Sequence, residues 1–270
     1  MLYYTEYLLI FATNTMLIMK KNILVLLVIG CALLNLSAQE TETNISPDFT
    51  KLKEMYEKEK YEDCAFKAET MTMKDKFRSA PEPYLFLAMC NWRIHEIGGE
   101  QLELDYPKAY ADAFKYAGKF RKKDKKKKLF EEYKEFFDQL KDAGVRDAID
   151  FYLSNDFRKA SSTLKKVYKV VPESTAIKFS KGVCDLKANN LSEGGLWIKE
   201  SSIELQKLAK DGSFEKDPAT DEMLADAFVI YSDYLIEKSN ADSARSTIRL
   251  GQVLLGDHYK IEAQAEKILK

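Results

Sequence analysis

The chain has 270 residues, of which 46% are hydrophobic and 31% are charged, and its formal net charge at pH 7 is −1. This apolar content is enough to bury a core, so bulk disorder is excluded, and the near-zero charge excludes a global field that recruits nucleic acid. Glycine and proline are sparse while lysine, glutamate, alanine and leucine are plentiful, which favours helices over turn-rich β architectures.

The segment 1–38 has the layout of an export signal. Lys20 and Lys21 precede the apolar run NILVLLVIGCALLNL, which is followed by the small-residue sequence SAQ. A basic segment, an apolar segment and a small-residue cleavage site are the parts of a secretory signal peptide, so cleavage is expected after Ala38. The apolar run is too short for a good transmembrane helix, and we expect no membrane span in the mature chain.

Two features of this segment bear on its processing. Residues 1–18 lie upstream of the signal layout, which predicts that Met19 is the true start. The sequence VIGC at 28–31 resembles a lipobox, which would make Cys31 a lipidated N-terminus, although the apolar run continues beyond it. The whole segment resembles export signals of the Bacteroidota. That resemblance implies a periplasmic or cell-surface protein, soluble after cleavage near Ala38 or, alternatively, anchored through Cys31.

The mature chain is expected to begin with a flexible polar tether over 39–46 and to continue as one domain over 47–270. Its three cysteines are Cys64, Cys90 and Cys184. An odd number permits at most one internal disulfide, and Cys64 with Cys90 is the pair to test. The apolar neighbours of all three cysteines favour buried free thiols instead.

Small and large apolar residues recur along the chain with one period, about 34 residues. One such period separates Ala160 from Gly194, and the same period separates Leu164 from Ile198. Small residues recur where two helices touch closely, and large residues recur where they fill the space between helices. Self-similarity at a fixed period of this length is typical of stacked helical hairpins.

The unit from 144 to 172 resembles the tetratricopeptide repeat (TPR). The resemblance rests on Ala148 and Phe151 in a first helix, Asn155–Asp156 at the turn, and then Phe157, Ala160, Leu164, Val167 and Pro172. Gly144 departs from the pattern, because the family favours a large residue there. In the following unit Asp185 replaces the aromatic residue of the first helix.

Four other units match less closely. Their markers are Leu52, Tyr61 and Cys64; Tyr84, Leu87, Ala88, Tyr106 and Ala109; Gly182, Leu191, Gly194 and Ile198; and Phe228, Leu235, Ala241, Ala244 and Ile248. Longer spacings between successive small residues place extra chain near 95–104, 122–140 and 208–222. The resemblance implies an all-α fold, a right-handed α-solenoid of about five TPR-like helical hairpins that ends in a C-terminal capping helix.

No set of residues typical of catalysis is found. The only histidines, His95 and His258, lie far apart in sequence, and the glycine pairs lack the pattern of a phosphate-binding loop. The sequence therefore predicts no enzyme, no metal and no cofactor. The remaining functional class is binding.

In TPR arrays the first helix of each unit lines a concave face that binds peptides or partner helices. The resemblance implies a partner-binding groove at Tyr56, Trp92, Arg93, Tyr152, Lys187, Asp226, Asp233 and Glu237. It thus implies a non-catalytic scaffold whose partners are other proteins. Two alternatives stay open: Trp92 and Tyr152 pack between helices, or the protein captures glycans, with Trp92 stacking on a sugar.

The run KFRKKDKKKK at 119–128 is strongly basic. One interpretation is a peripheral contact with an anionic surface through Arg121, Lys122, Lys123, Lys125, Lys126, Lys127 and Lys128. The other interpretation is a solvated helix end, since acidic residues follow directly.

Overall fold

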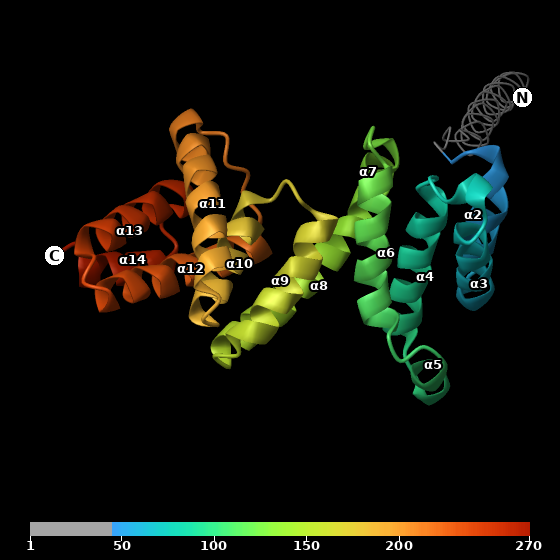
Figure 1. Cartoon of the computed structure of the whole chain (residues 1–270), viewed down its shortest axis with the longest axis horizontal. Helices are drawn as coiled ribbons and strands as arrows, with labels where there is room; N and C mark the ends of the chain where they lie inside the picture. Colours follow the sequence, from blue (N-terminus) through green and yellow to red (C-terminus); the bar gives the residue numbers. More distant parts are fainter. Residues whose placement is uncertain (1–44) are drawn as a thin grey trace, which may run out of the picture. The chain divides into compact units, whose positions relative to one another are not determined.

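The computed structural model describes residues 45–270, so the predicted export signal and residues 39–44 of the predicted tether lie outside the described residues. All regular structure in the described part is helical, which confirms the predicted all-α class. The α-helices, drawn in Figure 1, are α2 (Thr50–Glu57), α3 (Tyr61–Thr72), α4 (Glu82–Ile97), α5 (Glu100–Asp105), α6 (Ala109–Lys123), α7 (Lys128–Glu132), α8 (Lys134–Leu153), α9 (Phe157–Val170), α10 (Thr175–Lys187), α11 (Leu191–Asp211), α12 (Pro218–Glu237), α13 (Ala241–Leu255) and α14 (Tyr259–Ile268). Two short 3-10 segments, η1 (Pro47–Phe49) and η2 (Asp75–Phe77), complete the list.

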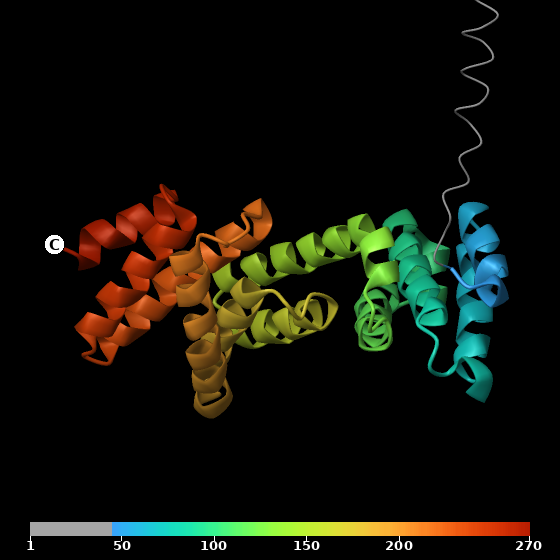
Figure 2. The same cartoon turned by 90° about the horizontal axis from the view of Figure 1, so that it is seen from above.

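Helices that follow one another in sequence also pack against one another. The extensive contacts are between α3 and α4, α4 and α6, α8 and α9, α10 and α11, and α12 and α13. Figure 2 shows α8 and α9 side by side. Further contacts join α6 to α9, α9 to α10 and α10 to α12, and α14 closes the end of the array by packing on α12 and α13.

One turn geometry recurs at four places. Glu59, Asn155, Asn189 and Ser239 have φ angles of 57°, 56°, 66° and 57°, and each lies between two packed helices. In every case the amide of this residue donates to the carbonyl three residues earlier, and the next amide donates to the carbonyl five residues earlier. This is the Schellman arrangement of a helix C-terminus. One repeat period separates Asn155 from Asn189, as it separates the markers found in the sequence.

A small buried residue follows each of these turns at one structural position. The amides of Cys64, Ala160, Gly194 and Ala244 each donate to the carbonyl four residues earlier, in the first turn of the second helix. All four residues are buried or line the helix crossing. The small residues picked out by the repeat period therefore occupy equivalent places in the backbone.

The extra chain lies where the spacings placed it. Helix α5 falls largely within the stretch predicted near 95–104, and α7 falls within 122–140. The third stretch, 208–222, contains the end of α11 and the irregular segment that precedes α12.

The apolar core forms two clusters that meet at α10. Ile177 and Cys184 belong to the N-terminal cluster, whereas Phe179 and Val183 belong to the C-terminal one. Helix α10 is therefore covered on opposite sides, and its buried residues include the charged Lys181 and Asp185. Such a helix connects the packing of the two halves.

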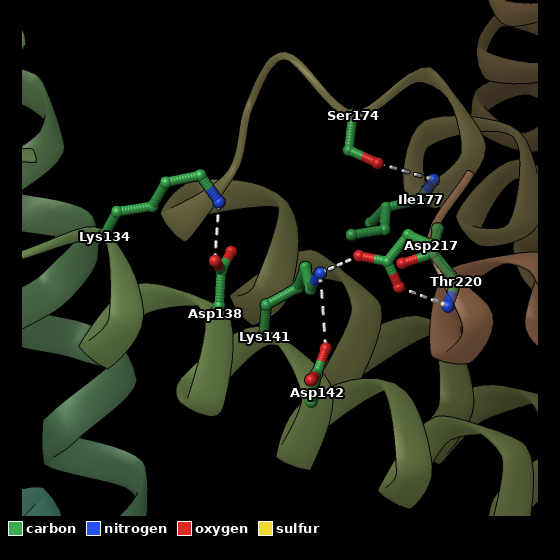
Figure 3. Close-up of polar contacts among 8 residues, drawn as sticks. All are labelled: Lys134, Asp138, Lys141, Asp142, Ser174, Ile177, Asp217 and Thr220. Atoms are coloured by element: carbon green, nitrogen blue, oxygen red, sulfur yellow. Dashed lines mark hydrogen bonds and ion pairs between the residues drawn. The ribbon is translucent and has the colours of Figure 1, made fainter. Parts of the chain in front are cut away.

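A polar link joins α8 to the start of α12, as Figure 3 shows. The amine of Lys141, whose side chain is 11% exposed, contacts Asp217 and lies 3.2 Å from Asp142. Asp217 also caps α12 by accepting from the amide of Thr220 at 3.1 Å. Burial alone would lower the pKa of Lys141 and raise that of Asp217. The polar contacts of the two side chains outweigh burial, so the pKa of Lys141 is raised and the pKa of Asp217 is lowered.

Candidate functional site

A pocket of about 410 Å³ lies among α2, α4 and the start of α8. Its walls also include the first residue of α3 and the last residue of α7. The lining residues are Tyr56, Tyr61, Trp92, Arg93, Glu132, Tyr133, Glu135, Phe136 and Gln139. Three of the eight predicted groove residues, Tyr56, Trp92 and Arg93, are thus brought together here.

The recurrent turn positions the tyrosines on one wall of this pocket. Tyr56 lies in the last turn of α2 and Tyr61 begins α3, so the turn at Glu59 brings their rings to 5.2 Å in an edge-on arrangement. The guanidinium of Arg93 lies 5.7 Å from the centre of the Tyr61 ring and forms an ion pair of 2.7 Å with Glu96. The contacts with Tyr61 and with Glu96 therefore fix the position of the Arg93 guanidinium.

Stacked phenylalanines fix the opposite wall. Phe137 on α8 stacks on Phe120 of α6 at 5.1 Å and contacts Phe130 of α7 at 5.0 Å. Phe136 packs edge-on against Phe137 at 4.9 Å. These contacts attach the start of α8 to α6 and α7 and thereby place Tyr133 and Phe136 on the pocket.

Tyr56 and Tyr133 stay protonated at physiological pH. Burial, with Tyr61 and Cys90 close by, raises the pKa of Tyr56 well above its usual value. Burial and the charges of Glu132 and Glu57 raise the pKa of Tyr133 to about 12. The pocket therefore offers neutral rings and hydroxyl groups, not phenolates.

Trp92 and Tyr152, both predicted to line the groove, are packing residues. Trp92 is 7% exposed, with its ring 6.1 Å from Tyr110 and 5.7 Å from His95. Tyr152 is 4% exposed and donates its hydroxyl to the carbonyl of Ser180 at 3.0 Å. The alternative in which these two rings pack between helices is the one found, because each fills the space next to a neighbouring helix.

The other predicted groove residues lie away from this pocket. Lys187, at the end of α10, has its amine 5.8 Å from the Phe157 ring. On α12, Asp226 pairs with Lys260 at 2.6 Å, Asp233 pairs with Lys267 at 2.8 Å, and Glu237 is exposed. Lys260 and Lys267 belong to α14, so the terminal helix binds the side chains of Asp226 and Asp233 on α12.

Sequence reasoning missed Tyr61, Tyr133 and Phe136. Tyr61 is one of the repeat markers. Tyr133 and Phe136 lie in the stretch 122–140, which the spacings place outside the repeat. A signal was present nonetheless, since Tyr133 and Phe136 are aromatic residues spaced three apart, the first directly before α8 and the second in its first turn.

The basic run divides into bound and unbound residues. Arg121 forms two hydrogen bonds of 2.8 Å to Glu173 and lies 3.5 Å from the Phe130 ring, with its side chain 4% exposed. Lys123 donates to the carbonyl of Arg78 and lies 4.8 Å from the Tyr84 ring. Arg121 and Lys123 therefore make contacts within the fold, unlike the other residues predicted for the anionic-surface contact.

The remaining lysines of the run lie in or beside an anchored loop. Asp124 is 7% exposed and accepts from the amide of Phe130 at 2.8 Å, which fixes the loop between α6 and α7. Six exposed lysines of the run make no side-chain hydrogen bond or ion pair to any described residue: Lys119 and Lys122 on α6, Lys125, Lys126 and Lys127 in the loop, and Lys128 at the start of α7.

The three cysteines of the described part are buried and free. Cys64 donates to the carbonyl of Leu52 at 3.3 Å. Contact with Cys64, together with burial, raises the pKa of Cys90, and burial raises the pKa of Cys184 to about 12. The thiols of Cys90 and Cys184 are therefore protonated and unreactive in the folded chain at neutral pH.

The two histidines lie in separate surroundings. His95 is exposed beside Tyr110, with ring centres 4.9 Å apart, and His258 contacts Glu222 at 2.9 Å. Within residues 45–270 no group of three His, Cys, Asp or Glu side chains could hold a metal ion. None of the helices described there has the length and apolar character needed to cross a bilayer. Comparison of the chain with protein-family models and with curated proteins gives no match.

Proposed function

We propose that the chain is a non-catalytic scaffold of the cell envelope that binds a segment of a partner protein. In this proposal α2–α3, α4–α6, α8–α9, α10–α11 and α12–α13 are five TPR-like hairpins of a right-handed solenoid, and α14 is its cap. The observation that carries it is the single turn geometry at Glu59, Asn155, Asn189 and Ser239. A stacked array of this kind presents the first helices of its units as one binding surface.

The position of the pocket supports the same role. Tyr56, Arg93 and Tyr133 come from the first helices of three proposed units, or from the residue directly before one. An aromatic pocket on such a surface is suited to anchoring a side chain of an extended peptide. The assignment to the envelope rests on the export signal predicted in residues 1–38.

The glycan-capture alternative is not favoured. It assigned sugar stacking to Trp92, but this residue is 7% exposed and its ring packs against Tyr110. A buried ring cannot offer its face to a sugar. Binding of a protein segment requires no such exposed tryptophan.

Photo-crosslinking in the producing cells tests the proposal. A photoreactive phenylalanine derivative is placed at Tyr133 in the full chain, and in a control chain at Tyr168, which is half-buried on α9 against Trp197. We expect a defined protein adduct from position 133, mapped to one segment of the partner, and none from position 168. Equal adducts at both positions, or no adduct at position 133, would contradict a binding groove.

A second role is supported by the anchored lysine loop. Lys125, Lys126 and Lys127 of the loop, with Lys122 and Lys128 on the flanking helices, form a concentrated positive charge, which suits an anionic membrane surface. Flotation with vesicles rich in phosphatidylglycerol should carry the full chain, and replacement of Lys125–Lys128 by glutamine should abolish flotation. Equal flotation of the two chains would reject this role.

A further inference from the structure

A second pocket, of about 310 Å³, lies where α11 adjoins α13. Its buried side is aromatic: Phe179 and Phe228 have ring centres 5.0 Å apart, and the half-buried Tyr231 meets Phe179 edge-on at 5.9 Å. Small or polar side chains of α11 and α13 form most of the other walls, namely Ser202, Gln206, Asp242, Ser243, Ser246 and Thr247. The pocket therefore has an aromatic base and hydrogen-bonding walls.

Thr247 lies where the preceding unit has a tryptophan. Gly194 on α11 and Ala244 on α13 occupy equivalent places after the recurrent turn. The residues three positions beyond them are Trp197 and Thr247. A small side chain therefore replaces an indole at this point of the helix crossing.

The neighbours of Trp197 are replaced as well. Its ring meets Tyr168 of α9 edge-on at 4.9 Å and lies 4.4 Å from the amine of Lys181 on α10. Ser202 corresponds to Tyr168, since each lies eight residues beyond the small residue of its helix, and Tyr231 corresponds to Lys181, eight residues before the turn residue of positive φ. All three corresponding residues of the later crossing line the pocket. The pocket thus lies where the crossing of α9 and α11 holds its aromatic pair.

Several polar groups of the pocket are available to a ligand. The hydroxyls of Ser202 and Ser246 and the amide of Gln206 make no side-chain hydrogen bond to any described residue. Thr247 donates to a backbone carbonyl at 2.8 Å, which leaves its oxygen able to accept. The N–H of an indole is a donor only. An indole in the pocket can therefore pack on Tyr231 and donate to one of these oxygens.

We propose that this pocket binds a tryptophan side chain of a partner protein. The indole takes the place that Trp197 fills in the preceding crossing and completes the aromatic packing between α11 and α13. Aromatic rings attract one another beyond the burial of their area, and tryptophan is a frequent anchor of protein interfaces. The site shares no residue with the pocket at Tyr56, so this proposal does not depend on the groove proposed above.

Ligand-observed NMR with the full chain tests the preference for an aromatic ring. N-acetyl-tryptophanamide should bind in a saturable manner, and N-acetyl-cyclohexylalaninamide should bind about fivefold more weakly, the loss expected for one aromatic pair. No binding of the indole, or equal binding of the cyclohexyl compound, would overturn the proposal. Binding of methyl glucoside in preference to the indole would overturn it in favour of a sugar site.

Filling the pocket from within gives a matched pair of variants. Thr247→Trp installs the residue found at position 197 and should abolish binding while raising the melting temperature by about 3 °C. Arg249→Trp adds the same ring to an exposed position of α13 outside the pocket and should change neither quantity. A stabilised Thr247→Trp variant combined with a wild-type chain that binds no indole would show a packing gap only, and would overturn the proposal.

A milder variant keeps the test independent of how Thr247→Trp folds. Tyr231→Leu removes one ring of the base but retains an apolar side chain, and should weaken the indole about fivefold. Circular dichroism checks the fold of every variant. Unchanged binding by Tyr231→Leu would contradict contact between the ligand and this ring.

Free L-tryptophan distinguishes a docking site from a site for the amino acid itself. The one charged residue of the lining is Asp242, which pairs with Arg245 at 3.1 Å. The pocket therefore has no pair of charges for an ammonium and a carboxylate, and the blocked compound should bind at least as tightly as the free amino acid. Tighter binding of free tryptophan would overturn the docking of a protein side chain.

Discussion

The pairs α8–α9 and α10–α11 have the same backbone turn, one repeat period apart, but fill their helix crossings differently. At α8–α9 the crossing is apolar. A Cβ atom at Gly144 would lie 2.9 Å from Phe114 of α6 and would also collide with Val167 of α9. The space that a large residue at position 144 would fill is thus occupied by Phe114 of α6 and Val167 of α9.

At α10–α11 the two backbones themselves touch. A Cβ atom at Gly194 would lie 2.7 Å from the backbone nitrogen of Leu186 and 2.8 Å from the carbonyl oxygen of Gly182. Beside this crossing, the amine of Lys181 binds Asp185 at 2.5 Å.

Further contacts complete this buried polar cluster. Lys181 is 1% exposed, binds Glu193 at 3.1 Å and lies 4.4 Å from the Trp197 ring. Ser161 of α9 donates its hydroxyl to Asp185. The comparison teaches that the same backbone turn accepts an apolar or a polar crossing, provided that the charged groups buried at the crossing find partners.

Removing the charge of Lys181 should produce the largest effect. Lys181→Met leaves the 5%-exposed Asp185 without its cation and should lower the free energy of unfolding by about 3 kcal/mol or more. Urea denaturation followed by circular dichroism measures this. The double variant Lys181→Met/Asp185→Leu, which removes both charges, should recover most of the loss. A double variant as unstable as the single one would show that the cluster does not act as an ion pair.

The adjacent glycines of α11 offer a direct test of the close crossing. Gly194→Ala should cost about 2 to 3 kcal/mol, because its methyl group meets backbone atoms that cannot move independently of their helix. Gly195→Ala meets nothing within 4 Å and should stabilise the exposed helix surface by about 0.5 to 1 kcal/mol. Thermal unfolding of the two variants compares them, and equal shifts would reject the backbone contact.

The equivalence of the two turns can be measured separately from their crossings. Asn155 and Asn189 have φ angles of 56° and 66°, a region that costs an alanine about 1 to 2 kcal/mol. Asn155→Ala and Asn189→Ala should therefore destabilise by similar amounts, and the corresponding glycine variants should be nearly neutral. Clearly unequal alanine costs in chemical denaturation would show that the turns are not equivalent.

A smaller effect is expected at the link from α8 to α12, where the side chain of Asp217 is 34% exposed, than at the buried cluster on α10. Asp217→Asn retains a cap for α12 but removes the charge next to Lys141, and should cost about 1 kcal/mol at pH 7. Because folding lowers the pKa of Asp217, this contribution is present above its unfolded pKa of about 4 and is lost as pH falls through the folded pKa.

Unfolding measured across acidic pH should therefore show wild type and Asp217→Asn converging as pH falls. Asp138→Asn is the matched control, since its pair with Lys134 lies on the surface of the same helix and should contribute a few tenths of a kcal/mol (Figure 3). A difference between wild type and Asp217→Asn that stays constant with pH would contradict the ion pair.

The recurrence of small residues after equivalent turns is predictable from the sequence, because such a recurrence leaves a periodic signal. The repeat period located Ala160 and Gly194, which follow equivalent turns, and the longer spacings located the extra chain. Composition and periodicity likewise indicate an all-helical fold, since each helix buries one stripe of apolar residues.

The candidate site is less predictable because it lies partly outside the repeat. Tyr133 and Phe136 come from the extra chain, and only packing of Phe137 on Phe120 brings them to Tyr56. The partners of Asp185 cannot be predicted from the sequence either, because Ser161 donates to it from another helix. Trp92 shows the reverse case, where an aromatic residue at a groove position is used for packing.

Fluorine NMR on the full chain labelled with 5-fluorotryptophan tests the central claim most directly. The chain has two tryptophans, and they report on the two regions: Trp92 lines the aromatic pocket and Trp197 lies at the polar cluster of α10–α11. The variant Trp197→Phe assigns the signals. At constant ionic strength, a synthetic peptide of the partner segment mapped by crosslinking at position 133 should shift the Trp92 resonance in a saturable manner and leave Trp197 unmoved, while a peptide of scrambled sequence should shift neither. A Trp92 resonance that fails to move, or that moves equally with the scrambled peptide, would contradict the account.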